Sequence, residues 1–388
     1  MSGAPIVVLG SGLAGWTTVR ELRKLEPTVP VRLITADSGD FYAKPSLSNA
    51  FAQGKRPDQL VSTLAARMAE TLTVTLLPRT RVEAIDRAAR MVITENDRIR
   101  YSRLVIATGA QPIRVPLTGD GADAVRCVNS LDDFADFHGR LKPGARVAIM
   151  GAGLIGCEFA NDLATAGFNV TVIDPASRPL ASLLPDAASD ALGLALQSLG
   201  VGWHFATTVL AVHRHGDSLQ LELANGTSIT ADAVLSAIGL RADTALARAA
   251  ELVCERGIVV DSTLATSDAD IFALGDCAQY AGGLWADGPV AGGHTLPYVM
   301  PIMNAARVLA AQLAWRPGTL AFPLMPVSIK TPALPLVVAS PALASVGQWH
   351  SSEEGLWHFI DDSGLARGFV LAGKQTSRRA EQARRIAV

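Results

Sequence analysis

The chain has 388 residues, of which 49% are hydrophobic and 18% are charged, and its 34 basic residues nearly balance 36 acidic ones. This length allows two or three domains with large apolar cores. The formal net charge of −2 gives no indication of a nucleic-acid partner or of binding to an anionic membrane. No apolar run approaches the roughly 18 residues that span a bilayer, and the N-terminus enters a strand without a signal segment. We therefore expect a cytoplasmic protein with no nucleic-acid partner and no membrane insertion.

The chain opens with a predicted buried strand, a glycine-rich turn and a helix. The apolar pattern predicts a strand over 5–9, a helix that ends near Leu25, and a second strand over 31–35. The turn consists of Gly10, Ser11, Gly12, Leu13, Ala14 and Gly15. Such a turn directs backbone N–H groups and a helix N-terminus at one place, which is typical of a site for the pyrophosphate of a dinucleotide. Asp37, 22 residues after Gly15, is placed to accept hydrogen bonds from a ribose.

The same pattern occurs a second time, beginning with a predicted strand over 146–150. Its turn contains Gly151, Gly153, Leu154, Ile155 and Gly156. A helix follows to about Ala166, and a strand over 170–173 leads to Asp174, 18 residues after Gly156. A carboxylate at this position bonds the 2′-hydroxyl of NAD and repels the 2′-phosphate of NADP. The second site is therefore predicted to prefer NAD, although the nearby Arg178 weakens that preference.

The chain crosses twice between two predicted domains. Strands over 104–107 and 233–238 are each followed by a glycine, Gly109 and Gly239, and prolines follow the first crossing. The segment between the crossings is therefore expected to form a domain inserted into the sequence of another.

A later segment, 271–277, is predicted to be a buried strand with an acid, Asp276, at its C-terminal end. Ligands of open α/β sheets bind at the C-terminal ends of the strands, so Asp276 is expected to face the first nucleotide. The alternative is that Asp276 caps the N-terminus of the segment that follows it.

From about residue 318 the pattern changes to short alternating strands. Strands over 322–330, 335–339, 357–361 and 368–371 precede a basic stretch, 374–385, which is predicted to be a helix. The expected fold class is α/β, with two Rossmann-like dinucleotide-binding domains and a small C-terminal α+β domain. The predicted boundaries are 1–115 with 241–317 for the first nucleotide domain, 116–240 for the second, and 318–388 for the α+β domain.

The four cysteines lie at positions 127, 157, 254 and 277, with neither C-x-x-C nor C-x4-C spacing. This arrangement argues against a sequence-local redox disulfide and against a zinc cluster. Each cysteine is interpreted as a small buried hydrophobic residue. The histidines also lack the spacing of a metal site, so no metal is expected.

Four segments resemble a known family: residues 42–48, with the sequence YAKPSLS, and residues 151–162, 296–303 and 330–338. With these segments in place, the chain resembles over nearly its whole length the two-dinucleotide flavoprotein reductases related to glutathione reductase. It is most similar to the rubredoxin reductases, a branch that lacks the redox disulfide and feeds small iron proteins. One departure is Asn49, where ferredoxin-reductase relatives often carry a lysine.

The resemblance implies a tightly bound FAD at the first site and NADH as an exchangeable substrate at the second. The FAD-binding residues that it implies are Gly10, Ser11, Gly12, Leu13, Ala14, Gly15, Thr35, Ala36, Asp37, Lys44, Val82, Ala107, Thr108, Gly109, Glu158, Asp276, Val299 and Lys330. The NAD-binding residues are expected to be Gly151, Gly153, Leu154, Ile155, Gly156, Asp174 and Gly239.

The resemblance also suggests three catalytic residues, Lys44, Glu158 and Lys330. The two lysines would place positive charge beside the flavin, and Glu158 would bond Lys44 or the nicotinamide carboxamide. A helix expected to begin near Pro297 would direct its N-terminus and the N–H of Val299 at the reduced ring. The alternatives are a turn lysine at 44, a solvated strand-end lysine at 330, and an acid at 158 that is favoured only by the helix dipole.

Together these features predict an NADH:rubredoxin reductase that passes hydride from NADH to FAD and single electrons to rubredoxin, in the service of alkane hydroxylation. The alternatives are an NADH:ferredoxin reductase of another oxygenase system and a non-catalytic FAD/NADH redox sensor. An NADH oxidase or peroxidase is disfavoured, because those relatives need a cysteine soon after the first nucleotide unit and 37–60 contains none.

The predicted partner, rubredoxin or another small iron–sulfur protein, is usually acidic, so docking predicts a local basic patch. The candidate residues for this patch are Arg378, Arg379, Arg384 and Arg385. The alternative interpretation is a solvated terminal helix.

Overall fold

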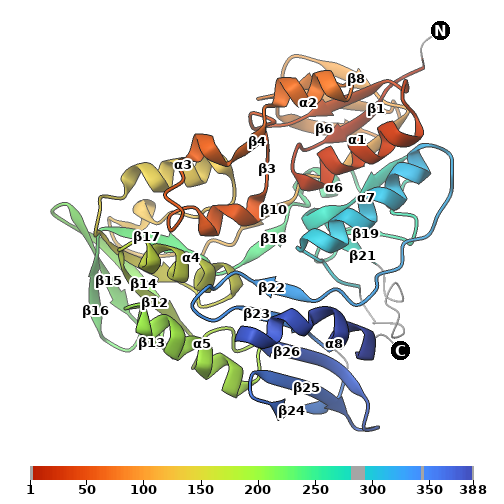
Figure 1. Ribbon diagram of the computed structural model, residues 1–388. Coiled ribbons are helices and arrows are strands. Elements are labelled where there is room, and N and C mark those ends of the chain that lie inside the picture. Colours follow the sequence, from red (N-terminus) through yellow and green to blue (C-terminus); the bar gives the residue numbers. More distant parts are fainter. Residues whose placement is uncertain (1–2, 281–292, 342–344, 387–388) are drawn as a thin grey trace. The chain divides into compact units, whose positions relative to one another are not determined.

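The computed structural model describes residues 3–280, 293–341 and 345–386. The chain folds into two units, each assembled from three separated segments (Figure 1). Unit 1 contains Met1–Ala43, Val61–Gln111 and Leu240–Met325, and unit 2 contains Lys44–Leu60, Pro112–Gly239 and Pro326–Val388. Within the described ranges, no helix has the length and apolar character needed to cross a membrane.

Unit 1 is built on a five-stranded parallel sheet with the strand order β20-β9-β1-β2-β5. Its strands are β1 (Ile6–Leu9), β2 (Val31–Ile34), β5 (Thr75–Leu77), β9 (Arg103–Ile106) and β20 (Ile271–Ala273). The helices of this unit are α1 (Leu13–Leu25), α2 (Ala65–Thr71), α6 (Ala245–Ala249) and α7 (Val299–Leu313). All four residues of β1 are buried, as a parallel strand in the middle of a covered sheet requires. The strand–turn–helix–strand unit predicted at the N-terminus is confirmed.

The remaining strands of unit 1 form small sheets around this core. One is a three-stranded antiparallel sheet of β6 (Val82–Asp86), β7 (Met91–Thr94) and β8 (Arg98–Arg100). Another is a parallel pair of β19 (Ile258–Val260) and β21 (Ala278–Tyr280). Two further pairs are β3 (Phe41–Tyr42) with β4 (Val61–Thr63), and β10 (Ala110–Pro112) with β18 (Leu240–Ala242). A single-turn helix, η4 (Gly275–Cys277), follows β20.

Unit 2 contains a second parallel sheet, with the strand order β13-β12-β11-β17. Its strands are β11 (Arg146–Met150), β12 (Asn169–Asp174), β13 (Gly202–Phe205) and β17 (Ala233–Ser236). The helices that accompany it are α3 (Leu131–Arg140), α4 (Leu154–Thr165) and α5 (Asp186–Ser198). An antiparallel sheet is formed by β14 (Val209–His215), β15 (Ser218–Leu223) and β16 (Ser228–Ala231). The second strand–turn–helix–strand unit is thereby confirmed as well.

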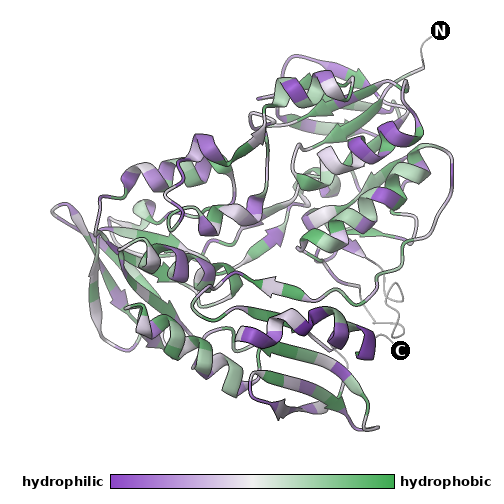
Figure 2. Cartoon of the chain, in the orientation of Figure 1, coloured by the Kyte–Doolittle hydropathy of each residue, from purple (hydrophilic) through white to green (hydrophobic). Residues whose placement is uncertain are grey.

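The C-terminal part of unit 2 is a five-stranded antiparallel sheet with the order β22-β23-β26-β25-β24. Its strands are β22 (Val327–Ile329), β23 (Leu336–Ala339), β24 (Gly347–Glu353), β25 (Leu356–Asp361) and β26 (Ala366–Ala372), followed by α8 (Arg379–Ile386). Apolar residues of β22, β23 and β26 belong to the same core cluster as residues of β11, β12, α4 and α5. Figure 2 shows that the sheets and α8 differ in hydropathy: the strands are largely hydrophobic (green), whereas α8 is largely hydrophilic (purple). The α/β fold class is confirmed, and the division into three domains stays a prediction, since the two units do not separate residues 318–388.

Single-turn helices complete the chain: η1 (Lys44–Asn49), η2 (Pro57–Leu60), η3 (Ala122–Ala124) and η5 (Gly373–Arg378). The prediction of one continuous helix over the basic stretch 374–385 is therefore wrong in its first part, where the chain forms the 3-10 helix η5. The hydroxyls of Thr376 and Ser377 donate to carbonyls three residues earlier, at 2.8 and 3.0 Å, which competes with α-helical bonding.

The helix expected near Pro297 begins slightly later than predicted, at Val299 with Tyr298 as its N-cap. The N–H of Tyr298 donates to the carbonyl of Leu296 at 2.8 Å, so this residue still belongs to the preceding turn. Pro301 lies in the first turn of α7, where the missing N–H has no intrahelical partner to lose.

Candidate functional site

The first glycine-rich turn in unit 1 leaves an open place in front of α1. Gly10 has a φ of 103°, and a Cβ there would lie 2.3 Å from the carbonyl oxygen of Ala107. A Cβ on Gly15 would lie 1.9 Å from the carbonyl oxygen of Gly10. By contrast, no described atom comes within 4 Å of a Cβ built on Gly12, the exposed N-cap of α1. The strand and the helix thus pack closely at Gly10 and Gly15, and the side of the turn at Gly12 is free for a phosphate group.

The N-terminus of α1 is suited to an anion because its own first turn carries no acidic side chain. No side chain caps Gly12, and the first turn, which includes Leu13 and Ala14, has no acidic residue. Unpaired N–H groups at a helix N-terminus attract an anionic ligand. The turn therefore fits the pyrophosphate of a dinucleotide.

Asp37 holds the turn through a network of hydroxyl groups. Its Oδ1 accepts hydrogen bonds from the hydroxyls of Ser11 and Thr35, at 2.9 and 2.6 Å, and from the N–H of Gly39 at 2.9 Å. Ser11 and Thr35 also contact each other at 2.9 Å. Because all three bonds end on Oδ1, Oδ2 remains the oxygen placed to bond a ribose. Ala36, between Thr35 and Asp37, is exposed.

Other residues predicted for the first site lie around the same turn. A Cβ on Gly275, the residue before Asp276, would lie 2.9 Å from the Cβ of Ala14, so η4 lies against the start of α1. The start of α7, with Val299 exposed, contacts η4 as well. Asp276 is half-buried in this turn.

The remaining predicted FAD residues of unit 1 follow neighbouring strands. Ala107, Thr108 and Gly109 come directly after β9, and the hydroxyl of Thr108 donates to the carbonyl of Asp243 at 3.3 Å. Val82 opens β6, two residues after Thr80, whose N–H donates to the carbonyl of Thr35 at 2.8 Å. The structure thus brings these residues to the edge of the sheet where the glycine turn lies.

The second glycine turn, in unit 2, repeats the backbone of the first. Gly151 has a φ of 105°, and a Cβ on Gly156 would lie 1.9 Å from the carbonyl oxygen of Gly151. Gly153 is the exposed N-cap of α4, and a Cβ there would meet no described atom within 4 Å. This turn, with the half-buried Leu154 and the exposed Ile155 behind it, fits a second pyrophosphate. Gly239, with a φ of 115°, follows the neighbouring strand β17.

Asp174 supports its turn differently from Asp37. Its Oδ2 accepts from the N–H of Ala152 at 2.6 Å, and its Oδ1 accepts from the N–H of Ala176 at 2.7 Å. Both oxygens are thereby tied to backbone, and each keeps a second lone pair for a ribose hydroxyl. The carboxylate charge at the end of β12 is therefore held in place beside the turn.

Arg178, four residues after Asp174, does not stand alone. Its guanidinium forms ion pairs with Asp186 and, at 3.5 Å, with Asp190, both on α5. The bond to Asp186 raises the pKa of Arg178. The positive charge that could attract a 2′-phosphate is thus paired with two carboxylates, which favours NAD over NADP at this turn.

Two of the three predicted catalytic residues meet in a partly buried ion pair within unit 2. Glu158 is fully buried on α4, and its Oε2 accepts from Lys330 Nζ and from the hydroxyl of Ser48 at 2.6 Å. Its Oε1 accepts from the backbone N–H of Lys330 at 3.0 Å. Lys330 Nζ also donates to Ser48 Oγ at 2.9 Å and to the carbonyl of Pro45 at 2.6 Å.

This geometry weighs against the two simpler interpretations of these residues. Lys330 is held by three oxygen atoms rather than surrounded by water, with 31% of its side chain exposed. Glu158 points away from the helix axis to partners outside α4, so it does more than complement a helix dipole. Lys44, the third predicted residue, begins η1 next to Pro45 and is half-buried.

Sequence reasoning missed the two polar residues that continue this contact along α4. Asp162, buried, accepts from the N–H groups of Phe51 and Ala52, at 3.0 and 2.9 Å. Burial raises the pKa of Asp162, and these two N–H groups act in the opposite direction. Asn161, also buried, accepts from the N–H of Ala333 at 3.0 Å. The available signal was the polar pattern at 158, 161 and 162 on an otherwise apolar helix.

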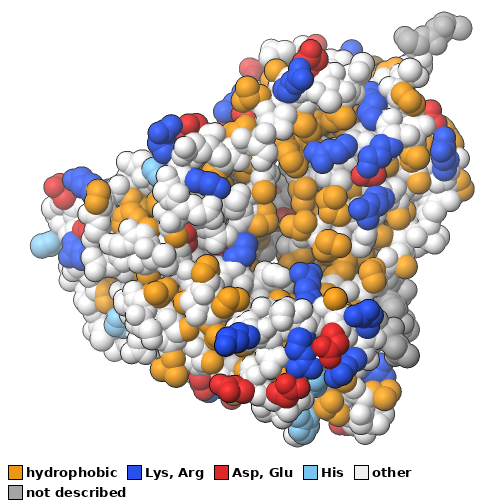
Figure 3. All heavy atoms as spheres, in the orientation of Figure 1, with side chains coloured by type: hydrophobic (Ala, Val, Ile, Leu, Met, Phe, Trp, Pro, Cys, Tyr) orange, Lys and Arg blue, Asp and Glu red, His pale blue; other side chains and the backbone are white. Residues whose placement is uncertain are grey.

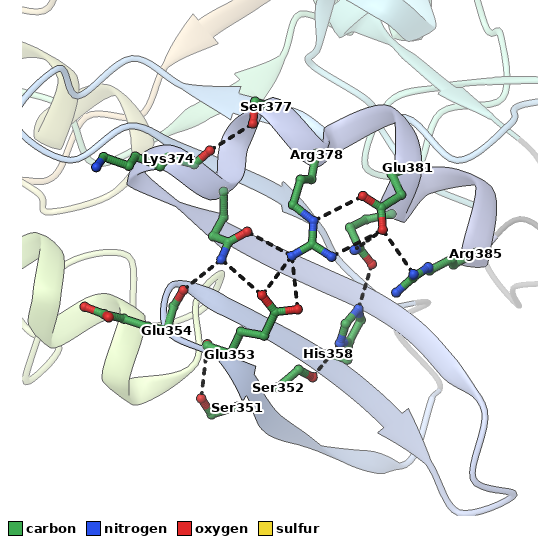
Figure 4. Close-up of polar contacts among 12 residues, drawn as sticks. Ser351, Ser352, Glu353, Glu354, His358, Lys374, Ser377, Arg378, Glu381 and Arg385 are labelled. Atoms are coloured by element: carbon green, nitrogen blue, oxygen red, sulfur yellow. Dashed lines mark hydrogen bonds and ion pairs between the residues drawn. The ribbon is translucent and has the colours of Figure 1, made fainter.

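The C-terminal arginines are largely engaged in local contacts. Figure 4 shows Arg378 between Glu353 on β24 and Glu381 on α8, and Arg385 on the far side of Glu381. The hydrogen bonds to Glu381 and Glu353 raise the pKa of Arg378. Arg379 donates to the hydroxyl of Ser328 at 3.0 Å and to the carbonyl of Pro326 at 2.6 Å.

The surface over α8 is therefore mixed rather than uniformly basic. In Figure 3 blue basic and red acidic side chains alternate in this region. Arg384 donates to a backbone carbonyl of its own helix, that of Ala380, at 3.2 Å, which leaves its charge without a carboxylate partner among the described residues. Any docking of an acidic partner here would depend on Arg384 more than on Arg378.

The cysteines provide no redox pair. All four are free, and Cys157 and Cys277 are buried. Burial raises the pKa of Cys277 to about 11 and raises that of Cys157 still further. The two thiols donate to backbone carbonyls, Cys157 to Ala152 and Cys277 to Ile106 and Leu274. In the described ranges no group of three or more His, Cys, Asp or Glu side chains is arranged to hold a metal ion.

Comparison with known proteins gives consistent matches over nearly the whole chain. Residues 4–305 match the family described as pyridine nucleotide-disulphide oxidoreductase, and residues 319–386 match a family described as rubredoxin binding C-terminal domain. The rubredoxin-NAD(+) reductase of Alcanivorax borkumensis is 43% identical, over 95% of this chain and 95% of that protein. The nitric oxide reductase FlRd-NAD(+) reductase of Aeromonas hydrophila is 40% identical, over 96% of this chain and 94% of that protein.

The solved structures that match agree with the fold. A chain in the crystal structure of the covalent putidaredoxin reductase-putidaredoxin complex superimposes with a TM-score of 0.88 and 23% identity, over 100% of this chain and 95% of that chain. The ferredoxin reductase for the CYP199A2 system from Rhodopseudomonas palustris gives a TM-score of 0.87 and 23% identity, over 98% and 94%. At this identity the likeness concerns the fold.

Proposed function

The chain belongs to the pyridine nucleotide-disulphide oxidoreductase family, and on this premise we propose that it is an NADH:rubredoxin reductase. The observation that carries the choice of acceptor is the match of residues 319–386 to a rubredoxin-binding domain. The identity of 43% to a rubredoxin-NAD(+) reductase, over 95% of this chain, supports the same acceptor.

Each unit is proposed to bind one nucleotide at its glycine turn. FAD is assigned to the turn of unit 1, where Gly12 opens α1 and Asp37 Oδ2 is placed for the ribose. NADH is assigned to the turn of unit 2, where Gly153 opens α4 and Asp174 supplies the carboxylate. When bound, FAD supplies the redox chemistry, accepting a hydride from NADH and releasing electrons singly.

The residues of the chain bind, orient and stabilise charge. With FAD bound, the N–H groups at the start of α7, including that of Val299, would stabilise negative charge on the ring. Lys44 and Lys330 would provide cations for the same purpose. Glu158 holds Lys330 in one orientation through its side chain and its backbone N–H, so this ammonium cannot swing freely into solvent. No protein base is assigned, because hydride transfer needs none.

The acceptor is the part of the proposal that an assay tests most directly. NADH-dependent reduction of cytochrome c is measured with purified rubredoxin or a [2Fe–2S] ferredoxin as mediator, with NADPH in a parallel series. We expect rubredoxin to restore the rate and NADH to be preferred. A rate restored only by ferredoxin would assign the chain to the ferredoxin reductases of other oxygenase systems.

Docking of an acidic rubredoxin is tested by charge reversal on α8. Arg384→Glu is expected to raise the KM for rubredoxin about 3- to 10-fold at low salt, with a weaker salt dependence than the wild type. Arg67→Glu, an exposed change in unit 1, is the matched control, since Arg67 pairs with Glu70 of its own helix. An unchanged KM and salt dependence for Arg384→Glu would leave α8 as a solvated helix.

A non-catalytic FAD/NADH sensor is the remaining alternative class. Rapid bleaching of the flavin absorbance by NADH in a stopped-flow experiment, followed by steady turnover, distinguishes an enzyme from a sensor.

We further propose that the protein acts in the cytoplasm and supplies electrons to an alkane-oxidising monooxygenase. Loss of growth on alkanes, with growth on other carbon sources retained, is the expected result of deleting its gene.

A further inference from the structure

Helix α4 carries three buried polar side chains on an otherwise apolar segment. Glu158, Asn161 and Asp162 are 0%, 2% and 2% exposed. Buried polar groups need hydrogen-bond partners, because an unpaired one loses its water without compensation. Each of the three accepts hydrogen bonds from residues outside α4. We name this set of three residues the α4 clamp.

The first segment that the α4 clamp holds is 44–52. Asp162 accepts the N–H groups of Phe51 and Ala52 on its two oxygens, at 3.0 and 2.9 Å. Glu158 accepts the hydroxyl of Ser48 at 2.6 Å. The ring of Phe51 lies 5.3 and 5.7 Å from those of Phe134 and Phe168. The segment that begins with Lys44 is thus attached by its backbone and by its side chains.

The second segment is 330–334. Glu158 accepts the backbone N–H of Lys330 at 3.0 Å and also pairs with its ammonium group. Asn161 accepts the N–H of Ala333 at 3.0 Å. The two segments are further joined to each other, since Lys330 Nζ donates to the carbonyl of Pro45 at 2.6 Å. One face of one helix therefore holds the chain shortly after Lys44, and at and shortly after Lys330.

We propose that Asn161 and Asp162 are positioning residues for hydride transfer, because they hold the segments that present Lys44 and Lys330. This inference rests on the proposed function, in which those two lysines lie beside the flavin. The clamp belongs to the same helix whose N-terminus is the second glycine turn, so one rigid element sets the nucleotide turn and both cations. A displacement of about 1 Å at such a site can lower a rate about 100-fold.

The carboxylate of Asp162 cannot be replaced by an amide without loss. Both of its oxygens accept an N–H, whereas asparagine offers one acceptor oxygen and one donor NH2. Asp162→Asn therefore turns a donor toward either Phe51 or Ala52 and leaves that N–H unpaired. Asp133→Asn is the control for loss of a carboxylate charge. Asp133 on α3 also accepts two backbone N–H groups, those of Asn129 and Ser130, but it accepts both on Oδ2, so one amide oxygen can keep both bonds.

The test uses the FAD-loaded full chain in single-turnover flavin reduction by NADH, together with amide hydrogen exchange. For Asp162→Asn we expect a reduction rate at saturating NADH at least 10-fold lower and a Kd for NADH within about twofold. The amides of Phe51 and Ala52 are expected to exchange faster. Asp133→Asn is expected to keep both of its backbone hydrogen bonds and the flavin reduction rate of the wild type. Asn161→Ala is the milder second variant. It removes the bond from Ala333 and a longer bond to Thr165 within α4, at 3.4 Å, with an expected rate loss of about threefold.

Two results would overturn the proposal. The first is faster exchange at Phe51 and Ala52 with an unchanged reduction rate, and the second is an equal rate loss in Asp162→Asn and Asp133→Asn. The acceptor does not enter this reaction, so failure with rubredoxin would count against the proposed function alone. Likewise, a wild-type flavin that NADH does not reduce would contradict the proposed function before the variants are compared.

Discussion

The two glycine-rich turns share one backbone and differ in the helix that follows each of them. Both have a first glycine with φ near 100° and a third glycine whose Cβ would lie 1.9 Å from the first. The residue two positions after the third glycine is Thr17 in α1 and Glu158 in α4. Thr17 contacts the sulfur of Met303 on α7, at 3.8 Å, whereas Glu158 bonds Ser48 and Lys330.

The same contrast continues one turn further along the helices. Glu21 of α1 pairs with Lys24 on the surface, and the corresponding Asp162 of α4 is buried against backbone N–H groups. The shared turn thus fits a nucleotide in each unit. The face of the following helix decides what else each turn is connected to, and in the described part of the chain α4 bonds Lys330 and the segment that follows Lys44.

The largest expected effect is a loss of nucleotide binding, of FAD when the first turn is changed and of NADH when the second is changed. Gly15→Ala and Gly156→Ala each place a Cβ about 1.9 Å from a carbonyl oxygen, so the turn must shift. We expect Gly15→Ala to be purified largely without FAD. Gly156→Ala is expected to keep FAD while kcat/KM for NADH falls about 100-fold. Flavin absorbance per protein and steady-state kinetics measure both effects.

Gly139→Ala is the control for these two variants, because a Cβ on Gly139 in α3 meets no described atom within 4 Å. It is expected to retain both the flavin and the activity of the wild type. Loss of FAD from Gly156→Ala to the same extent as from Gly15→Ala would contradict the assignment of different nucleotides to the two turns.

The next effect concerns the ion pair that α1 lacks. Lys330→Met leaves the buried Glu158 carboxylate without its cation and is expected to lower the free energy of unfolding by about 2 kcal/mol. This loss in the free energy of unfolding is smaller than that for a fully buried ion pair, because 31% of the Lys330 side chain is exposed. The double variant Lys330→Met/Glu158→Gln is expected to be more stable than the sum of the single losses predicts. Urea unfolding measures the cycle, and strictly additive losses would show that the pair is not coupled.

A smaller effect concerns the choice of nicotinamide nucleotide at the second turn. Asp186→Asn/Asp190→Asn removes both carboxylates that pair with Arg178. We expect the ratio of kcat/KM for NADPH to that for NADH to rise about fivefold, because the guanidinium of Arg178 is no longer neutralised by two carboxylates and exposed pairs of this kind are weak. Adding Arg178→Ala to this variant should abolish the gain. A gain that persists without Arg178 would place the preference elsewhere, most directly on Asp174.

The smallest effect is expected at the thiols near the two turns. Because burial raises the pKa of Cys277 to about 11 and that of Cys157 further, both thiols stay protonated at pH 8. Neither is expected to react with a thiol reagent until the protein unfolds. Cys157→Ala and Cys277→Ala should keep turnover within about twofold of the wild type. A larger loss of turnover in either variant would reopen a role for a thiol in electron transfer.

Some elements could be predicted from local pattern alone. The two strand–turn–helix–strand units are readable because glycine spacing and apolar strands are consequences of local backbone geometry. The end of α1 at Leu25 followed from the pattern as well. The late start of α7 at Val299 could not be read, because Pro297 and Pro301 are both compatible with a helix N-terminus. The 3-10 helix η5 was also missed, because hydroxyl-to-carbonyl bonds compete with an α-helix without changing its composition.

The sequence by itself determined that the protein has two nucleotide turns, four cysteines without disulfide spacing, and lysines in family-like segments. Only the tertiary structure decided which groups those lysines meet. Glu158 and Lys330 lie 172 residues apart, and Asp162 lies 111 residues from Phe51. Such contacts follow from how separated segments pack, so no local pattern predicts them. The α4 clamp and the pairing of Arg178 with α5 became visible for this reason only once the chain was folded.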